Sequence, residues 1–541
     1  MSRAGGNMDL ILIPGLHGGL NTGLPRNLID VSESPKIQNF IVDKGVLTKR
    51  TGYAAAGGST PPDAQIQHLH YYYEQNGAKK RMWAFEQDDI KWSASYGGNW
   101  TRADSGGDPS GKQTGTDHYW CTTEIVRLSD LKTYLCFLQQ NTNPEDPEQG
   151  DVAGRVHYVN DAEASGASGV TILGGATGYN TSATYHRCKW MLEYGNRLCL
   201  YNIVWDSSGD KLMPTRIQWS AQGSFTVAGD WSSTAFGDLR TGAGAIVRAE
   251  LLRNTAYVYM EHSIISQNIT NDSSAPFRFD TMVPEVGLYS VRLLVNTGDA
   301  HYFVGNNRQI YEYFGGRDLR PIGDPIKEEF FNDIDKTFST YRRRNRSFGV
   351  YFRDLNAVGF VIPVDTTDPD IIYVYFFRTR RWFKFNTQHA FQAFAEYLKA
   401  DGVTGGYENI PYLAGVGSGT LYQWDYNTAN DAGTAIDAYV QTKDFLIDLK
   451  HKYAGINVYF EASGDGAAST VVVGYSPDDN TDPDSGWTEK TVTLTSGWDL
   501  YKANFNLSGY MAKFQFRNAV SGEKLKLGSI RIELERMDEE K

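Results

Sequence analysis

The sequence predicts an all-β protein: a β-propeller of six to eight blades with an extended N-terminal arm and a C-terminal β-sandwich. Short segments that alternate apolar or aromatic residues with polar ones recur along the chain, as in Arg216–Trp219, Gln309–Tyr313 and Trp382–Phe385. This alternation is the period of a half-buried strand. The chain is also rich in aromatic residues, with 33 tyrosines, 26 phenylalanines and 12 tryptophans, which favour strands. Repeated β units of this size are typical of propellers.

Residues 1–62 are predicted to form the extended N-terminal arm and a first hairpin. Glycines at four positions between Gly15 and Gly23 predict an irregular, extended start. The tripeptide Asp43-Lys44-Gly45 separates two strand-like pieces and has the composition of a hairpin turn. Residues 54–62 contain small residues and two prolines, which is typical of a linker.

Residues 63–435 are predicted to form the propeller platform. Seven strand-rich units can be counted, but their spacing is uneven, so that six or eight units also fit. The sixth unit is the most regular, with strands expected at Phe348–Phe352, Ala357–Val361, Ile371–Phe377 and Trp382–Phe385. The longer units carry insertions, such as the acidic stretch Asn141–Gly150.

Residues 436–541 have a different rhythm, with turn residues about every ten positions, which predicts a β-sandwich. Seven strands are expected there: Ile436–Lys443, Gly455–Ala462, Thr470–Tyr475, Lys490–Leu494, Tyr501–Leu507, Ala512–Asn518 and Leu525–Glu535.

Charge and cysteine content limit the class of protein. The formal charge is −12, whereas general nucleic-acid binders need a basic face. None of the four cysteines has CxxC or zinc-site spacing, and each lies in an apolar context, which predicts buried free thiols and synthesis in a reducing compartment. We expect no export signal and no membrane contact, because no apolar run approaches the about 20 residues of a membrane helix.

Motifs for catalysis are not found in the sequence. It contains no GxSxG, HExxH or P-loop pattern, and His68 and His70 share one strand face without an evident third metal ligand. We therefore expect that the chain is not an enzyme, and we assign no catalytic, cofactor-binding or metal-ligating residue and no cofactor.

An acidic segment near the end of the chain has two interpretations. Residues Tyr475–Trp487 resemble the Asp-box of sialidase-like propellers, a turn in which Asp and Ser bond the backbone above a Trp. Its carboxylates could instead bind calcium, although they lack EF-hand spacing. We favour a structural turn for this group, which consists of Asp478, Asp479, Asp482 and Asp484.

Two groups of residues are candidates for contact with a second subunit or a neighbouring protein. Arg50 and Tyr53 are of types enriched at contact centres, and capping of the first propeller strand is an equally good interpretation. The strongest basic cluster could contact DNA phosphates or an acidic neighbour, but we favour a solvated edge or a subunit contact. This cluster consists of Arg342, Arg343, Arg344 and Arg346.

Three motifs, taken in their order along the chain, carry a family resemblance. The first spans Pro35–Tyr53, the second combines Gly195–Leu198 with Pro214–Ser220, and the third spans Gly419–Ile436. Together they resemble the tail nozzle, or packaged-DNA stabilisation, proteins of short-tailed bacteriophages. Thr51 occupies the place where that family commonly has a proline.

The resemblance implies a structural virion protein at the distal end of the head–tail connector. Such proteins form a ring of usually six copies, which extends the DNA channel, helps to retain packaged DNA until ejection, and gives tail fibres or spikes a place to attach. The implied partners are further copies of the chain, the connector ring proteins, the fibres or spikes, and double-stranded DNA that passes through the lumen without specific binding. The implied location is the virion tail, after synthesis in the host bacterial cytoplasm.

A second interpretation keeps the propeller but changes its role. Exposed aromatic residues and the Asp-box-like turn are also typical of a propeller that binds or hydrolyses carbohydrate. A glycosidase needs two facing carboxylates, and an acidic chain offers too many candidates for such a pair to be selected from sequence.

Overall fold

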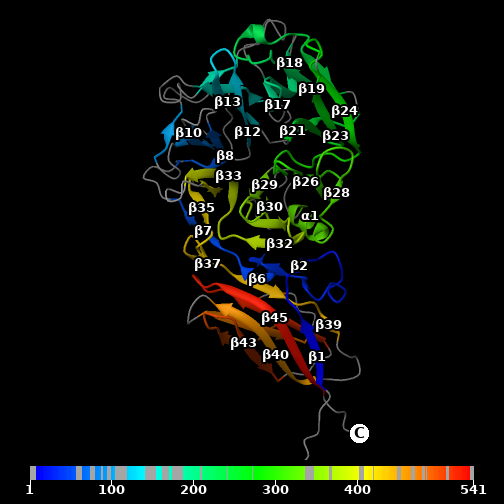
Figure 1. Cartoon of the computed structure of the whole chain (residues 1–541), viewed down its shortest axis with the longest axis vertical. Helices are drawn as coiled ribbons and strands as arrows, with labels where there is room; N and C mark the ends of the chain where they lie inside the picture. The colour runs from blue at the N-terminus through cyan, green and yellow to red at the C-terminus, as the bar shows by residue number, and fades with distance from the viewer. Residues whose placement is uncertain are drawn as a thin grey trace, which may run out of the picture.

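The computed structural model consists almost entirely of antiparallel sheets (Figure 1). It describes residues 8–536 apart from the following stretches: 57–61, 63, 74–79, 87–88, 94–98, 104–118, 141–153, 161–169, 174–186, 207–209, 240–241, 271, 336–345, 365–367, 401–406, 418, 447–452, 465–468, 478–481, 483 and 507–510.

The described strands of the first half of the propeller form four sheets. The first sheet contains β8 (Ile66–Tyr73), β9 (Lys80–Glu86), β10 (Ile90–Ser93) and β11 (Thr101–Arg102). The second contains β12 (Tyr119–Arg127), β13 (Lys132–Gln140), β15 (His157–Asn160) and β16 (Thr171–Ile172). The third contains β14 (Gly154–Arg155), β17 (Arg187–Glu193), β18 (Leu198–Asp206), β19 (Asp210–Trp219) and β20 (Phe236–Asp238). The fourth contains β21 (Ile246–Leu252), β22 (Thr255–Met260), β23 (Ser263–Ile269) and β24 (Phe277–Pro284).

Three further sheets complete the series. The fifth contains β25 (Leu294–Asn296), β26 (His301–Gly305), β27 (Gln309–Tyr313) and β28 (Arg320–Pro321). The sixth contains β29 (Phe348–Phe352), β30 (Ala357–Ile362), β31 (Ile371–Phe376) and β32 (Arg381–Asn386). The seventh contains β33 (Phe391–Ala400), β34 (Tyr407–Gly415), β35 (Leu421–Asp425), β7 (Gly52–Ala55), β36 (Asn430–Asp431) and β37 (Thr434–Ala435).

The sheets are arranged in a closed circle. One strand of each sheet contacts the corresponding strand of the following sheet, in the order β8, β12, β17, β21, β25, β29 and β33, and β33 contacts β8. Figure 1 labels β8, β12, β17, β21, β29 and β33 around the middle of the upper part of the molecule. A closed circle of this kind leaves no long unpaired sheet edge. The predicted fold class, an all-β propeller followed by a β-sandwich, is confirmed.

The N-terminal segment closes this circle. Strand β7 adds to the seventh sheet beside β35, with Tyr53 opposite Trp424. The last sheet therefore combines residues from the two ends of the propeller sequence, and the pairing of β7 with β35 links the start of the propeller to its end.

The C-terminal residues form two sheets that pack face to face. One contains β43 (Asp499–Phe505), β40 (Tyr453–Gly464), β45 (Leu525–Arg536), β6 (Val46–Lys49), β5 (Phe40–Asp43) and β1 (Met8–Ile13). The other contains β4 (Ile37–Gln38), β38 (Ala438–Gln441), β44 (Met511–Asn518), β41 (Thr470–Ser476), β42 (Thr488–Thr493) and β39 (Phe445–Leu446).

The segment expected as an arm supplies strands to this sandwich. Strand β1 pairs with β45, β6 pairs with β45, and β4 pairs with β38. Strands β5 and β6 form the hairpin around Lys44 and Gly45, whose φ angles of 50° and 84° suit the tight turn between them. The short strands β2 (Gly19–Leu20) and β3 (Glu33–Ser34) pair in parallel, and β2 lies against β32.

A short helix, which the strand pattern did not predict, covers the sixth sheet. Helix α1 (Lys327–Asp335) buries Phe330, Phe331 and Ile334, and the Phe330 ring meets the Tyr373 ring edge-on at 5.3 Å. One large apolar cluster includes residues of this helix, of the last propeller sheets and of the sandwich. The two parts of the molecule therefore share a continuous core.

Candidate functional site

A buried ion pair joins the N-terminal segment to the end of the propeller. Arg50 follows β6 and Asp431 lies in β36, and both side chains are about 1% exposed. The Arg50 Nη1 and Nη2 groups donate to the Asp431 Oδ1 and Oδ2 atoms at 2.9 and 2.6 Å. Two parallel charge-assisted bonds fix the position of the guanidinium as well as its charge.

The other donors of Arg50 also have acceptors. Its Nε group donates to Asn39 Oδ1 at 2.8 Å, and Nη1 and Nη2 donate to the carbonyls of Thr51 and Asn386 at 3.0 and 2.9 Å. A guanidinium has five N–H groups, and each of them is bonded here. Arg50 therefore connects the hairpin segment, the sixth sheet and the end of the seventh sheet in one buried network.

Tyr53 extends this junction into the seventh sheet. Its hydroxyl lies 3.0 Å from His389 Nδ1 and accepts a hydrogen bond from the His389 backbone N–H at 3.2 Å. The ring meets those of Phe391 and Tyr422 edge-on, each at 5.3 Å between centroids. Burial raises the pKa of Tyr53 above its ordinary value, so the hydroxyl stays protonated and can donate to the imidazole nitrogen.

We define these residues as the junction site: Asn39, Arg50, Tyr53, Trp424 and Asp431. Both candidate contact residues of the first group, Arg50 and Tyr53, are buried inside the protein, where they hold β7 and the preceding turn in place. Asn39 and Asp431 were not selected from the sequence, although both lie inside the quoted motifs. No local sequence signal identifies this pair, because nothing in either motif marks its charged residue as buried.

The second group of candidate contact residues is described only in part. Arg342, Arg343 and Arg344 lie outside the described residues. Arg346 precedes β29, and its Nη1 group donates to Asp368 Oδ1 at 2.7 Å. The one described member of the cluster therefore has a carboxylate partner within its own sheet region.

A hydrogen-bonded chain of polar side chains lies on the innermost strands of the first two sheets. His68 Nε2 lies 3.0 Å from Thr122 Oγ1, which lies 3.0 Å from His70 Nδ1. His70 Nε2 lies 2.9 Å from Glu124 Oε1. Burial lowers the pKa of His68 well below its ordinary value, and the charges of His70 and Arg292 act in the same direction. His68 is therefore neutral at pH 7.

Two arginines lie on the opposite part of the inner ring. Arg248 Nη2 donates to Glu250 Oε2 at 2.5 Å, and the guanidinium lies 4.7 Å from the Trp190 ring centre. Burial, the largest single influence, would raise the pKa of Glu250, but the charges of Arg248 and His301 together with the hydrogen bonds from Arg248 and Asn296 lower this pKa below its ordinary value. Arg292 donates to the carbonyl of Gln392, and burial lowers its pKa to about 10. This inner ring thus contains both signs of charge.

Histidine, cysteine and carboxylate side chains are the possible metal ligands of the described residues. Among the described residues, no group of three or more His, Cys, Asp or Glu side chains is arranged to hold a metal ion. The four cysteines are free and buried, as the sequence predicted, and burial raises the pKa of Cys121 to about 12. These thiols are therefore protonated and weakly reactive.

The acidic loop forms a turn in its described part. Asp482 Oδ1 accepts from the Asp484 backbone N–H at 2.9 Å, and Asp482 Oδ2 accepts from Ser485 Oγ at 2.7 Å. Trp487 Nε1 donates to the Asp482 carbonyl at 2.6 Å, and the Trp487 side chain lies over Gly474. These contacts give the turn a structural role; Asp478 and Asp479 lie outside the described residues.

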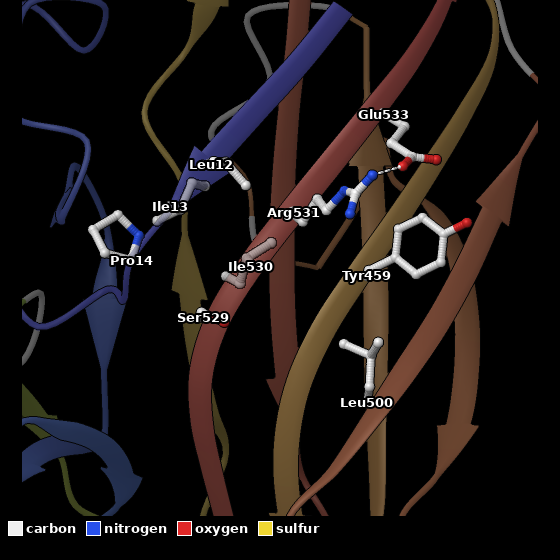
Figure 2. A pocket seen from close by; sticks show the side chains of 9 residues that line it. All are labelled: Leu12, Ile13, Pro14, Tyr459, Leu500, Ser529, Ile530, Arg531 and Glu533. Atoms are coloured by element: carbon white, nitrogen blue, oxygen red, sulfur yellow. Dashed lines mark hydrogen bonds and ion pairs between the residues drawn. The ribbon is translucent and has the colours of Figure 1, made fainter. Parts of the chain in front are cut away.

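A groove of about 790 Å³ crosses the outer face of the sandwich sheet formed by β1, β45, β40 and β43. Figure 2 shows Leu12 on β1 and Leu500 on β43 at opposite sides, with Tyr459 and the ion pair of Arg531 with Glu533 between them. The complete lining is Leu12, Ile13, Pro14, Tyr459, Leu500, Ser529, Ile530, Arg531 and Glu533.

The register explains why these side chains share one face. Arg531 on β45 lies opposite Leu12 on β1 and opposite Tyr459 on β40, which in turn lies opposite Lys502 on β43. Because side chains alternate between the two faces of a strand, the residues two positions away continue the same face. Sequence analysis missed this face because β1 and β45 lie at opposite ends of the chain.

No protein-family model and no curated protein matches the chain. Solved structures do match. An exo-beta-1,3-galactanase from Phanerochaete chrysosporium with beta-1,3-galactotriose has 8% identity and a TM-score of 0.27, and the match covers 92% of this chain and 100% of that one. The same enzyme with galactose has a TM-score of 0.26. A family 29 carbohydrate-binding module matches 26% of this chain and 79% of its own, with 10% identity and a TM-score of 0.13.

These comparisons correct one expectation from the sequence. We expected that the chain is not an enzyme, but the proteins matched along nearly its whole length are an enzyme, an exo-beta-1,3-galactanase. At this identity and TM-score the likeness assigns no activity to the present chain. Within the described residues, no helix is long and apolar enough to cross a membrane.

Proposed function

We propose that this chain is a structural subunit of the tail of a short-tailed bacteriophage, where copies form the distal nozzle ring. The ring, of about six copies as the resemblance implies, would extend the DNA channel, help to retain packaged DNA until ejection, and give fibres or spikes a place to attach. Its neighbours would be connector ring proteins, and DNA would pass through it without specific binding.

One observation supports this proposal most directly. The first and third motifs of the nozzle resemblance are almost 400 residues apart in sequence, yet Arg50 of the first and Asp431 of the third form a bidentate buried pair. Tyr53 and Trp424, from the same two motifs, lie opposite each other in adjacent strands. The two motifs therefore act together within one chain: they close the circle of propeller sheets and hold it against the sandwich.

A fixed joint of this kind suits a part that must transmit force. The N-terminal segment pairs first with the sandwich through β1 and β6 and then with the seventh sheet through β7. Relative motion of the two parts would require the buried Arg50 network to break, which leaves a buried charge without a partner. The geometry thus favours a rigid component over two domains that close around a ligand.

The experiment is to purify particles of the phage that encodes the chain and to locate the protein in them. Antibody labelling and electron microscopy are expected to find it as a ring at the distal end of the tail. A protein that is made during infection but is absent from purified particles would contradict the proposal.

A second candidate function, carbohydrate binding, is favoured by a single side chain. Trp498 precedes β43, is 51% exposed, and approaches Gly528 at the sandwich face that carries the groove. Exposed aromatic rings suit stacking contacts with apolar ligand faces. Trp487 is a poor candidate for this role, because it packs within its own turn. Binding to a glycan array that is lost in Trp498→Ala and kept in Trp487→Phe would support this function, and no binding would contradict it.

A further inference from the structure

Three strands of the sandwich sheet with the groove have only one partner each among the described strands: β1, β43 and β5. Strand β5 pairs with β6, but it also lies against β32 and β38. Among the described strands, β1 pairs only with β45, and β43 pairs only with β40. Each edge therefore presents a row of backbone N–H and C=O groups that can pair with another strand. We propose that these two edges are complementary, and that β1 of one copy pairs with β43 of a second copy of this chain.

The sequence of β1 lacks the features that usually protect an edge. The strand is Met-Asp-Leu-Ile-Leu-Ile, with one charge, no proline and no bulge in its register with β45. Proteins commonly blunt exposed edges with charged residues, prolines or bulges. An edge of this composition therefore needs a cover when the protein is assembled.

Exposed apolar side chains lie at both edges of the sheet. Leu10 and Leu12 on β1 are 52% and 61% exposed, and Trp498 and Leu500 at β43 are 51% and 63% exposed. Leu12 and Leu500 line the two sides of the same outer face (Figure 2). If the two edges pair, these side chains become neighbours on one continuous face and cover one another.

Strand direction permits this pairing. The pairs β1–β45, β45–β40 and β40–β43 are all antiparallel. Strands β1 and β43 therefore run in opposite directions within one copy, so that a second copy placed in the same orientation continues the antiparallel sheet. Each copy then contributes four consecutive strands, in the order β1, β45, β40 and β43.

A head-to-tail arrangement, in which β1 of one copy meets β43 of the next, covers more of the exposed apolar side chains than a symmetric pair of β1 strands. A twofold pair of β1 edges would cover Leu10 and Leu12 but would leave Trp498 and Leu500 exposed. Pairing of β1 with β43 covers the exposed apolar side chains at both of these strands in every copy. Contacts between two different surfaces of the same chain generate a ring when the rotation between copies closes. The pairing of β1 with β43 would then be the contact between neighbouring subunits of the proposed tail ring. That the copies close into a ring rests on the proposed function.

Engineered cysteines test the pairing, because the four native cysteines are buried. The variants Leu12→Cys and Leu500→Cys are made separately, mixed, and treated with a short thiol-reactive cross-linker, both as purified protein and in tail particles. The expected result is a cross-linked dimer in the mixture, with little or none in either variant alone. The control mixture combines Leu500→Cys with Val227→Cys, a residue that is 58% exposed in the propeller, and is expected to give no dimer.

The outcomes separate this inference from the proposed function. Cross-links between two Leu12→Cys chains alone would show the symmetric arrangement and would overturn the pairing of β1 with β43. A ring in tail particles without cross-links in the mixture would overturn the pairing and leave the function standing. Cross-linked multimers of a protein that is absent from particles would support the pairing and contradict the function.

A second variant tests the apolar contact without a cross-linker. Leu12→Asp places a charge at the edge of β1 and is expected to abolish self-association, while Val227→Asp is expected to leave it intact. Circular dichroism confirms that each variant is folded. Unchanged self-association of folded Leu12→Asp would overturn the inference. Leu12→Asp or Trp498→Ala protein that loses glycan binding but still self-associates would overturn it as well.

Discussion

The molecule uses the same kind of ion pair in two regions with opposite surroundings. At the junction site, Arg50 and Asp431 are both about 1% exposed, and every donor of the guanidinium is bonded. On the outer face of the sandwich, Arg531 pairs with Glu533, but the arginine side chain is 55% exposed. The comparison shows that burial, more than the pair itself, decides what an arginine contributes to the structure.

The difference has a physical cause in hydration. Water stabilises an exposed arginine after its partner is lost, whereas a buried arginine without a partner retains the full cost of desolvation. The junction is therefore stable and sensitive to mutation, while the outer face tolerates change and is available to a neighbour.

Loss of the buried pair is expected to have the largest effect. Arg50→Met leaves Asp431 buried without its bidentate partner, and such losses typically cost about 3–5 kcal/mol. The free energy of unfolding, measured by urea titration with tryptophan fluorescence, is expected to fall by this amount. A loss below about 1 kcal/mol would show that the junction does not hold the two parts together.

Lys49 gives a pH-dependent test of the same buried region. Its Nζ group donates to Asn518 Oδ1 at 2.6 Å, and burial lowers the pKa of Lys49 to about 8 from 10.5. The folded state therefore binds fewer protons than the unfolded state between about pH 8 and pH 10.5, and stability contributed by this group rises with pH across that window. The gain is at most about 3 kcal/mol.

The measurement compares the protein with Lys49→Met at several values of pH. The difference in unfolding free energy between the two proteins is expected to change in favour of the native lysine as pH rises from 8 to 10. Equal pH dependence in both proteins would mean that Lys49 has an ordinary pKa. Lys502→Met, on the exposed face of the sandwich, is the matched control for the loss of a lysine charge.

Removal of one hydroxyl at the junction is expected to have a smaller effect. Tyr53→Phe deletes the bonds to the His389 ring and backbone, at a cost of about 1–2 kcal/mol. Thermal unfolding followed by circular dichroism should detect a lower Tm. Tyr459→Phe, on the outer face, is the matched control and is expected to leave the Tm unchanged; equal shifts in both variants would remove the contrast.

The exposed pair is expected to contribute least. Arg531→Met should change the free energy of unfolding by at most about 1 kcal/mol, because surface pairs seldom contribute more. The same urea titration as for Arg50→Met provides the comparison. A loss as large as that of Arg50→Met would contradict the distinction between the two regions.

Sequence predicted the local elements far better than their partners. The four strands expected in the sixth unit agree with β29 to β32 within one residue at every end, because turn residues bound them and β-branched and aromatic residues fill them. The strands expected after residue 436 agree with β38 and β40 to β45 within two residues at each end. Helix α1 was missed because its apolar residues, Phe330, Phe331 and Ile334, are few and lie among charged ones.

Long-range pairing was outside the reach of pattern analysis. Strand β1 pairs with β45 across more than 500 residues, and the local sequence of either strand does not identify its partner. Arg50 was identified as notable, but its partner Asp431 was not, since an arginine in sequence carries no sign of whether its charge will be buried. Closure by β7 and the shared core with the sandwich are consequences of such distant contacts.

The most direct test of the account is an electron cryo-microscopy map of the assembled tail from particles that contain this chain. The account predicts a closed ring of copies at the distal end of the tail, in which Leu12 of each copy lies beside Leu500 of the next. Copies of this chain at any other place in the tail, or a ring in which the β1 and β43 edges of every copy face solvent, would contradict it.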